Sequence, residues 1–456
     1  MSDAAAQPQS EEQDTGAELV AILTSRGYRG LLLVAAIIGI PVALLAWGFL
    51  AIVHGLEHVV WESVPSALGQ SEPAWWYGVV VLTVAGLLVG LAIRLLPGTG
   101  GHIPAHGLGG GMPTPAEMPG ILVAAIASLT LGAVVGPEAP LVAIGAGAVI
   151  VALRQTKLHT NPQAGALLSV AGSAAAVATI FGNPVVAVVL MLEVVGFAGQ
   201  KVLVVLLPSV MAAGVGALVF TGLGDWTGFE APSLGIPGLP AGTLDVADLL
   251  WTIPLSIVCA LFAQAARRVG LAVAHRADKS RGKTVQLTAV VGLVVGLCAA
   301  AYSLMTDRPI SDVLFSGEVA LGELVSQPQE WVTGTLLLLI LFKGIAYAVS
   351  IGAFRGGPTF PALFIGAAIG ILAGNLPGFG PTAAIAVGMA AATSAVLRLP
   401  ITSIVLVTLL LGTQALSQIP IVLVAAVIGL VTAVSLDQKE SIRPVKIREQ
   451  RRAAES

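Results

Sequence analysis

Glu138 stands out because of the sequence that surrounds it. It lies in GPEAPLVAIGAGA, residues 136–148, and GPTFPALFIGAAI at residues 357–369 repeats Gly, Pro, Pro, Ile, Gly and Ala at the same spacing without an acid. A proline at the first turn is typical of a helix start, because its missing N–H has no partner inside the helix. Pro137 and Pro358 therefore predict two helix starts, whose free N–H groups and positive dipole ends attract an anion.

A carboxylate at one of two such helix starts would compete with a mobile anion. We expect Glu138 to close the path when it occupies the site. When it is protonated or moves away, an anion can enter, and the same group can carry a proton. Glu138 could instead simply cap the start of its own helix. Inside a membrane an ionisable side chain is costly and functional by default, so the gate is the favoured interpretation.

The composition places these residues in a lipid bilayer. Apolar residues make up 56% of the 456-residue chain and charged residues only 10%, against about 25% charged residues in soluble domains. The apolar run at 31–53 can cross a hydrocarbon core of about 30 Å. Others, such as 139–153 and 400–412, fall short of the roughly 20 residues that a span needs. The sequence predicts an all-α polytopic membrane protein with broken, tilted and re-entrant helices.

A second pair of similar blocks indicates an internal duplication. GSAAAVATIFGNPVVAVVLML (172–192) and GMAAATSAVLRLPITSIVLVT (388–408) share a Gly, three alanines and a proline at equal spacing. Duplicated halves with interrupted helices are a transporter architecture, with the site at the repeat interface near the membrane midplane. We predict two inverted-topology repeats, at 29–222 and 246–436, joined by a loop at 223–245.

Charged segments predict the orientation of the chain. Residues 1–28 are acidic at their start and read as a disordered tail, while the segments 267–283 and 437–456 are rich in Lys and Arg. The positive-inside rule places the two basic segments in the cytoplasm. We expect a multi-pass protein of the cell (plasma or inner) membrane with both termini cytoplasmic. The chain has no basic patch with interleaved aromatics, so nucleic acid is not an expected partner.

Four motifs carry a family resemblance. GPEAP (136–140) resembles the Gly-x-Glu-Gly-Pro gate motif of the CLC family of chloride channels and chloride/proton exchangers. GGHIPAHG (100–107) is similar to the family's first anion-binding loop, and KGIAYAVSIGAFRGGPTFPALFIGAAIG (343–370) to the stretch that ends in its second anion-binding helix start. FGNPVVAVVLMLE (181–193) is similar to a family helix that begins Phe-x-x-Pro and ends in an acid. The resemblance implies antiparallel halves and a homodimer with one pore per subunit.

The resemblance also implies the residues of the site. Glu138 would be the gating acid, and the residues around the anion would be Gly101, His102, Ile103, Gly136, Ala139, Gly357, Thr359 and Phe360. Gly101 stands where the family usually has a serine, and Pro137 where it usually has an arginine. Thr359 could supply a substitute hydroxyl. The late tyrosine of the family has no match, so the preferred anion stays open among chloride, bromide, nitrate and fluoride.

The inner acid of the family's exchangers is in doubt. In exchangers it is typically the second residue of a Glu pair, and here the pair reads Glu193-Val194. Glu193 matches the first acid, which resembles a structural residue, although it could still relay protons. We therefore predict passive or weakly proton-coupled flux of chloride-like anions, with a stoichiometric chloride/proton antiporter as the alternative.

Other classes are less well supported. A cation-coupled transporter of an organic solute would need polar clusters at its helix breaks, whereas these breaks are mainly Gly and Pro. An enzyme is not expected, because neither His-Glu-x-x-His nor a nucleophile with a base occurs. His102 and His106 lack further metal ligands, so neither a metal nor a cofactor is expected, but either histidine could make an anion entrance pH-sensitive. Lys343 could attract anions, extend towards the membrane surface or pair with an acid. Arg355 and Arg398 could line a vestibule, or anchor helix ends.

Overall fold

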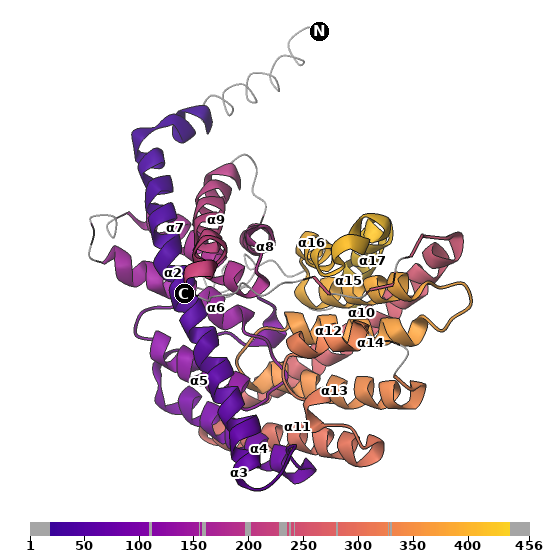
Figure 1. Cartoon of the computed structure of the whole chain (residues 1–456). Coiled ribbons are helices and arrows are strands. Elements are labelled where there is room, and N and C mark those ends of the chain that lie inside the picture. The colour runs from indigo at the N-terminus through magenta and orange to yellow at the C-terminus, as the bar shows by residue number, and fades with distance from the viewer. Residues whose placement is uncertain are drawn as a thin grey trace, which may run out of the picture.

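The structure of the chain, a computed structural model, consists of packed helices (Figure 1). It describes residues 19–437 except for 109–111, 155, 157–160, 197–201, 228–234, 237–238, 241, 280, 327 and 329–330. The first half contains α2 (Arg26–His58), α3 (Val64–Ala67), α4 (Trp75–Leu95), α5 (Met118–Thr130), α6 (Glu138–Leu153), α7 (Pro162–Phe181), α8 (Pro184–Val195) and α9 (Val202–Thr227). The second half contains α10 (Val246–Lys279), α11 (Thr284–Thr306), α12 (Glu318–Ser326), α13 (Thr333–Ala353), α14 (Thr359–Ala373), α15 (Pro381–Leu397), α16 (Pro400–Leu410) and α17 (Ala415–Leu436).

Helix lengths agree with a membrane protein built partly from half-helices. Within the described residues, eight helices are long and apolar enough to span a bilayer. Between them lie shorter apolar helices, among them α5 with 13 residues, α8 with 12 and α16 with 11. At a rise of about 1.5 Å per residue, these cannot cross a core of about 30 Å alone. The predicted all-α polytopic fold is confirmed.

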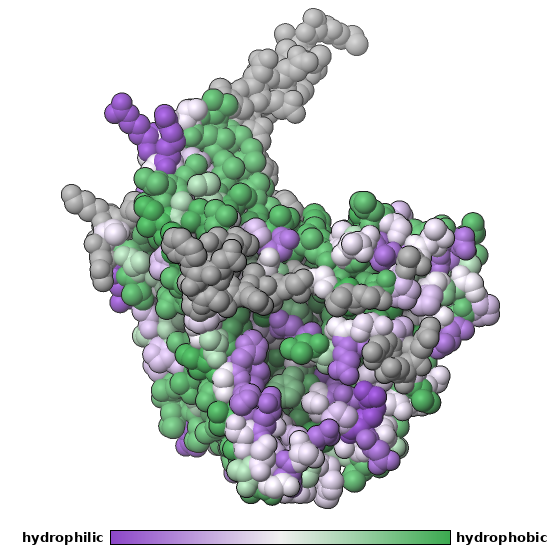
Figure 2. Space-filling view, in the orientation of Figure 1, coloured by the Kyte–Doolittle hydropathy of each residue, from purple (hydrophilic) through white to green (hydrophobic). Residues whose placement is uncertain are grey.

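The outer surface is apolar where long helices face outward. Figure 2 shows a green, hydrophobic surface along α2, whose exposed side chains include Leu33, Ile37, Leu45 and Ile52. Polar residues gather on the lower central part of the same face. An apolar area of this extent is what a surface in contact with lipid or another protein requires.

The two halves repeat the same helix packing. In the first, α6 crosses α7 where Gly145 meets Gly172, and in the second, α14 crosses α15 where Gly366 meets Gly388. A Cβ atom at any of these four glycines would strike the backbone of the opposite helix. Both contacts allow close helix approach, as small residues do in membranes. The two halves therefore share a repeated helix arrangement, as the duplicated motifs predicted.

The halves also pack against each other. Helix α4 lies along α11, with Gly86 and Gly90 of α4 against Thr288 and its neighbours on α11. In Figure 1 the indigo-to-magenta half and the orange-to-yellow half lie side by side. The seam between them is where the sequence predicts the functional site.

Some helix limits differ from those expected. Helix α2 begins at Arg26, so the end of the predicted tail 1–28 is helical, and residues 1–18 lie outside the described part. Helix α9 continues to Thr227, into the segment predicted as an inter-repeat loop. Helix α10 runs from Val246 to Lys279 and includes Arg267 and Arg268, which the sequence placed after the apolar segment. The charged residues mark a change in the environment of the helix, but the helix continues past them.

Asp437, at the end of α17, holds several elements of the second half together. Its carboxylate accepts hydrogen bonds from Arg267 at 3.0 Å, and from Gln264 and Arg398. Arg398 follows α15 in a left-handed conformation. Arg398 therefore anchors a helix end in this structure, and the basic tail that follows Asp437 lies outside the described residues.

Candidate functional site

The two duplicated motifs meet at their glycines. Gly136 and Gly357 form an isolated antiparallel bridge in which each N–H donates to the other's carbonyl oxygen, at N···O distances of 2.7 and 2.5 Å. They occupy equivalent positions in the two repeats, so the bridge relates the halves symmetrically. Pro137 and Pro358 follow as the N-cap residues of α6 and α14. The helices thus begin at Glu138 and Thr359, directly after the two prolines, as the repeated motifs predict.

Glu138 reaches across this seam. Its side chain is fully buried, and Oε1 accepts a hydrogen bond of 3.1 Å from the backbone N–H of Phe360, in the first turn of α14. Its other oxygen, Oε2, has no hydrogen-bond partner among the described residues. A Cβ atom at Gly357 would overlap the carboxylate, so this close approach requires glycine. The acid of one half therefore occupies the anion-attracting helix start of the other.

Several predicted anion contacts have other partners. The N–H groups of Gly136 and Gly357 bind each other, and the N–H of Gly101 donates to the carbonyl oxygen of Gly98 at 2.9 Å. These three amides cannot donate to an anion in this arrangement. Phe360 supplies the N–H that does contact a negative group. Thr359 is fully buried, and its hydroxyl has no partner among the described residues, so a donor remains at the start of α14.

A cavity of about 700 Å³ lies beside this contact. Of the residues predicted around the anion, Gly101, His102 and Ala139 line it, whereas Ile103 packs against the hydrophobic core. The wall also includes residues that were not among the predicted anion contacts: Arg355, Gly356, Ser169 and Ser173. The predicted residues therefore form two groups, one around the Glu138 carboxylate and one in the cavity next to it.

Arg355 connects the two motifs. Its Nε and Nη2 donate to the carbonyl oxygen of Thr99 at 3.3 and 3.1 Å, and its Nη1 donates to those of Ala353 and Phe354. The residues from Gly98 to Gly101 all have positive φ, a conformation that favours glycine. The arginine of the second half thus holds this strained loop of the first. Of the two roles that the sequence left open for Arg355, a vestibule lining and a helix-end anchor, its place in the cavity wall favours the first.

His102 stands in the cavity wall as a neutral group. A ring nitrogen, Nε2, lies 2.6 Å from the carbonyl oxygen of Gly107 and donates to it. Burial lowers the pKa of His102 below its usual value, and the positive charges of His106 and Arg355 lower it further, against the opposing effect of the Gly107 hydrogen bond. No group of three metal-binding side chains occurs in the described part of the chain.

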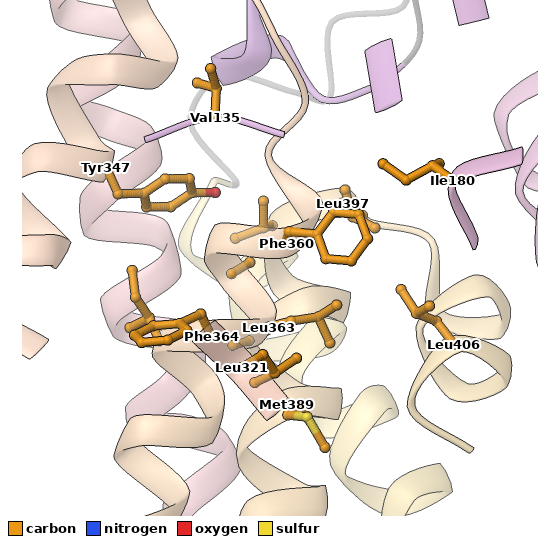
Figure 3. Packing of buried hydrophobic residues seen from close by; sticks show 14 of the residues in the cluster. Val135, Ile180, Leu321, Tyr347, Phe360, Leu363, Phe364, Met389, Leu397 and Leu406 are labelled. Carbon is orange, nitrogen blue, oxygen red and sulfur yellow. The ribbon is translucent and has the colours of Figure 1, made fainter. Parts of the chain in front are cut away.

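Tyr347 supports the start of α14, a role that was not predicted. Its buried hydroxyl donates to the carbonyl oxygen of Pro358 at 3.1 Å, and Figure 3 shows it directed towards the segment that carries Phe360. The ring of Phe360 packs against Phe181 with centroids 5.7 Å apart. A tyrosine on the helix that precedes the second motif was the available signal, since α13 must end close to α14.

Glu193 and Lys343 have partners of their own. The Glu193 carboxylate accepts from the N–H groups of Ile401 and Thr402 at 2.9 and 2.6 Å, and from the Thr402 hydroxyl at 2.6 Å. It caps the start of α16. The Lys343 ammonium group donates to four successive carbonyl oxygens, those of residues 312–315. Lys343 therefore neither reaches a membrane surface nor pairs with an acid in these contacts.

Comparison with known protein families identifies the family of this chain. The family model described as "Voltage gated chloride channel" matches residues 85–434, which include both motifs and the cavity. The chain is a member of this family, the CLC family. Its members are channels or transporters, so the expected class, a membrane transport protein and not an enzyme, agrees with the family.

Relatives and solved structures are consistent with CLC membership. "Putative ion-transport protein YfeO" of Escherichia coli strain SE11 is 30% identical over 346 residues, which cover 74% of this chain and 77% of the relative. A slow cyanobacterial Cl⁻/H⁺ antiporter has the same fold, with a TM-score of 0.73 at 18% identity, covering 93% of this chain and 97% of the other. A CLC-type fluoride/proton antiporter gives a TM-score of 0.64 at 16% identity, with coverages of 90% and 98%.

Proposed function

We propose that this CLC protein exchanges a small inorganic anion, such as chloride, for protons across the membrane, with Glu138 as gate and proton carrier. The observation that carries the proposal is the hydrogen bond from the Phe360 N–H to the Glu138 carboxylate. A negative group from one repeat there occupies the helix start of the other. Two solved structures with the same fold are described as anion/proton antiporters, which favours exchange over the passive flux expected from the sequence.

The chemistry follows from competition for one position. The ionised carboxylate satisfies the Phe360 N–H and lies at the positive end of the α14 dipole. An anion that arrives there offers the same donor an equivalent charge. Protonation removes the charge of Glu138, weakens it as an acceptor and releases the donor. The unpartnered Oε2 then becomes the natural place for the proton, since no described residue donates to it.

The cavity supplies a route to this position. Ala139 and Gly356, the neighbours of Glu138 and Gly357, line it. If α2 and α4 each cross the bilayer once, the loop at 96–102 returns to the side on which α2 begins. We place that side in the cytoplasm, together with both termini, by the positive-inside rule. A homodimer with one pore per subunit remains the expected assembly.

Passive anion flux is the second candidate. Glu193 is committed to the start of α16 by three hydrogen bonds, and Val194 follows it. Neither residue then supplies a mobile proton acceptor at the predicted inner position. An exchanger of this kind would need protons to reach Glu138 by another route, such as water in the cavity.

Reconstituted vesicles distinguish the two candidates. We would load vesicles with chloride, impose an outward chloride gradient without a proton gradient, and record chloride efflux and external pH together. Exchange predicts proton uptake in fixed proportion to chloride efflux, against an opposing proton gradient if one is imposed. Efflux without proton movement would select passive flux, and the absence of both would reject the proposed function.

Glu138→Gln tests the gate in the same assay. The amide keeps the size of the side chain but carries neither a charge nor a titratable proton, so chloride efflux should persist, lose its pH dependence and lose proton coupling. Glu72→Gln is the matched control, because Glu72 is exposed and lies outside the helices. Unchanged coupling in Glu138→Gln would reject this acid as the proton carrier.

A further inference from the structure

The cavity beside the gate contains a charged side chain and an unused hydroxyl that belong to none of the predicted anion contacts. We propose that Arg355 and Ser169 make this cavity an anion-holding site that sets the concentration dependence and the anion preference of transport. The inference rests on the proposed function, because it assigns the cavity to the same transported ion. It extends that function to two residues that lie on different repeats.

Arg355 supplies a fixed positive charge. The residue is only 6% exposed and lines the cavity. Its hydrogen bonds to the carbonyl oxygens of Thr99, Ala353 and Phe354 hold the guanidinium in one position. A guanidinium keeps its charge at any physiological pH, and a charge acts more strongly on an ion in a low-dielectric enclosure than in water.

Ser169 supplies the donor. The side chain is 1% exposed and lines the cavity, and its Oγ has no hydrogen-bond partner among the described residues. Ser173, one turn later on α7, also lines the cavity, but its hydroxyl donates to the carbonyl oxygen of Val142 at 2.9 Å. A buried hydroxyl without a partner is costly. A ligand in the cavity that accepts from Ser169 would remove that cost, and would replace the hydroxyl missing at Gly101.

The remaining polar residues do not provide this charge. His102 is neutral near pH 7, since its pKa is lowered mainly by burial. Glu117, at the cavity rim, carries an exposed carboxylate that accepts from the N–H of Thr114 at 2.7 Å and would oppose an anion. Among the described residues that line the cavity, Arg355 is the one that carries a positive charge near pH 7.

The size of the cavity defines the ligand class. At about 700 Å³ it is far larger than a bare halide, since one water occupies about 30 Å³ of liquid. A partly hydrated monovalent anion, whether chloride, bromide or nitrate, fits without selection by size. Preference among these anions then depends on the guanidinium and the hydroxyl. The position of Gly356 and Ala139 in the wall places the held ion next to the gate.

The test combines binding with transport. We would titrate chloride and nitrate into detergent-purified protein by calorimetry, and measure the chloride dependence of efflux from vesicles. The variants are Arg355→Lys, Arg355→Gln, Ser169→Ala and, as the matched control, Ser256→Ala, a buried serine outside the cavity lining whose hydroxyl donates to the carbonyl oxygen of Thr252. Thermal unfolding of each variant identifies any that fail to fold. If Arg355→Gln fails to fold, the conservative variants Arg355→Lys and Ser169→Ala provide the test.

We expect Arg355→Gln to weaken chloride binding and raise KM at least tenfold, because the charge is lost. Arg355→Lys should weaken binding less than fivefold and change the chloride-to-nitrate ratio, since it keeps the charge but not the planar fork. Ser169→Ala should weaken binding about two- to tenfold, the range of one hydrogen bond. Ser256→Ala should leave binding and KM unchanged.

Each failure has its own signature. Suppose that the native protein shows chloride efflux, while folded Arg355 and Ser169 variants keep the native binding and KM. That result would overturn this inference and leave the proposed function standing. Binding that depends on both residues without any efflux would support the site and reject the proposed function. Absence of both binding and efflux in the native protein would overturn both.

Discussion

Two acids of the first repeat reach helix starts of the second, and their surroundings differ. Glu193 gives both carboxylate oxygens to the start of α16, where two N–H groups and the Thr402 hydroxyl donate to them. Glu138 gives one oxygen to the Phe360 N–H at the start of α14, and the other has no partner among the described residues. The same chemistry, a carboxylate at a helix N-terminus, is fully satisfied in one place and half satisfied in the other.

The difference separates a structural acid from a displaceable one. A hydrogen bond to a charged group contributes about 1.5–3 kcal/mol to the free energy of unfolding. Removal of Glu193 would lose such bonds and leave several donors unpaired. Glu138 is fully buried with an unpaired oxygen, and its ionised form carries a desolvation cost that an incoming anion or proton can relieve. The number of donors around each acid therefore indicates its role better than its position in a motif.

The largest effect is expected from Glu193→Ala. The variant removes three hydrogen bonds at the start of α16, and we expect it to lower the free energy of unfolding by about 2–4 kcal/mol, given the partial exposure of the site. Loss of the thermal transition or a drop in Tm of several degrees would be measured on detergent-purified protein. Glu72→Gln serves as the exposed control. Unchanged stability would remove the structural interpretation of Glu193.

We expect Glu138→Gln to leave the stability of the protein almost unchanged, in contrast to Glu193→Ala. The amide oxygen can still accept from Phe360, and no charge remains to be buried, so we expect the free energy of unfolding to change by less than about 1 kcal/mol or to rise. Tm measured beside that of Glu193→Ala gives the comparison directly. A loss of stability as large as that of Glu193→Ala would show that both acids are structural, against the distinction drawn above.

The sequence was most informative about features that depend directly on residue types and segment lengths. Repetition of the Gly-Pro motif predicted that the two helix starts meet, and the acid in one copy predicted where a carboxylate would lie. Short apolar segments predicted half-helices, because length limits what can cross a bilayer. The bridge between Gly136 and Gly357 also explains why both copies keep a glycine there.

Other features depend on contacts between distant segments. The pairing of the two glycines through their own N–H groups removed donors that the motif implied were free. The tie from Arg355 to Thr99 spans the two repeats, and Ser169 enters the site from α7. No local pattern specifies such contacts, because each depends on how the two halves pack.

A smaller effect tests whether the donors at Glu193 act one by one. Thr402→Val removes the hydroxyl bond but leaves the N–H groups of Ile401 and Thr402. We expect the free energy of unfolding to fall by about 1–2 kcal/mol, less than for Glu193→Ala. Thr402→Ser, which keeps the hydroxyl, should fall by less. Equal losses for both variants would attribute the effect to packing of the methyl group.

The smallest effect is expected from His102→Gln, and it tests the neutral wall of the cavity. Burial, with smaller contributions from the charges of His106 and Arg355, lowers the pKa of His102 below its ordinary 6.5. A lowered pKa keeps the ring neutral as pH falls, so the protonation state of His102 does not change between pH 7 and 8. The pH profile of chloride efflux in that interval should therefore match the native profile in shape, and differences should appear only below about pH 6.5. Because Glu138 remains in this variant, a change of shape between pH 7 and 8 would mean that His102 is protonated there and adds to the positive charge of Arg355. That result would divide between two residues the anion attraction that we assign to Arg355 alone.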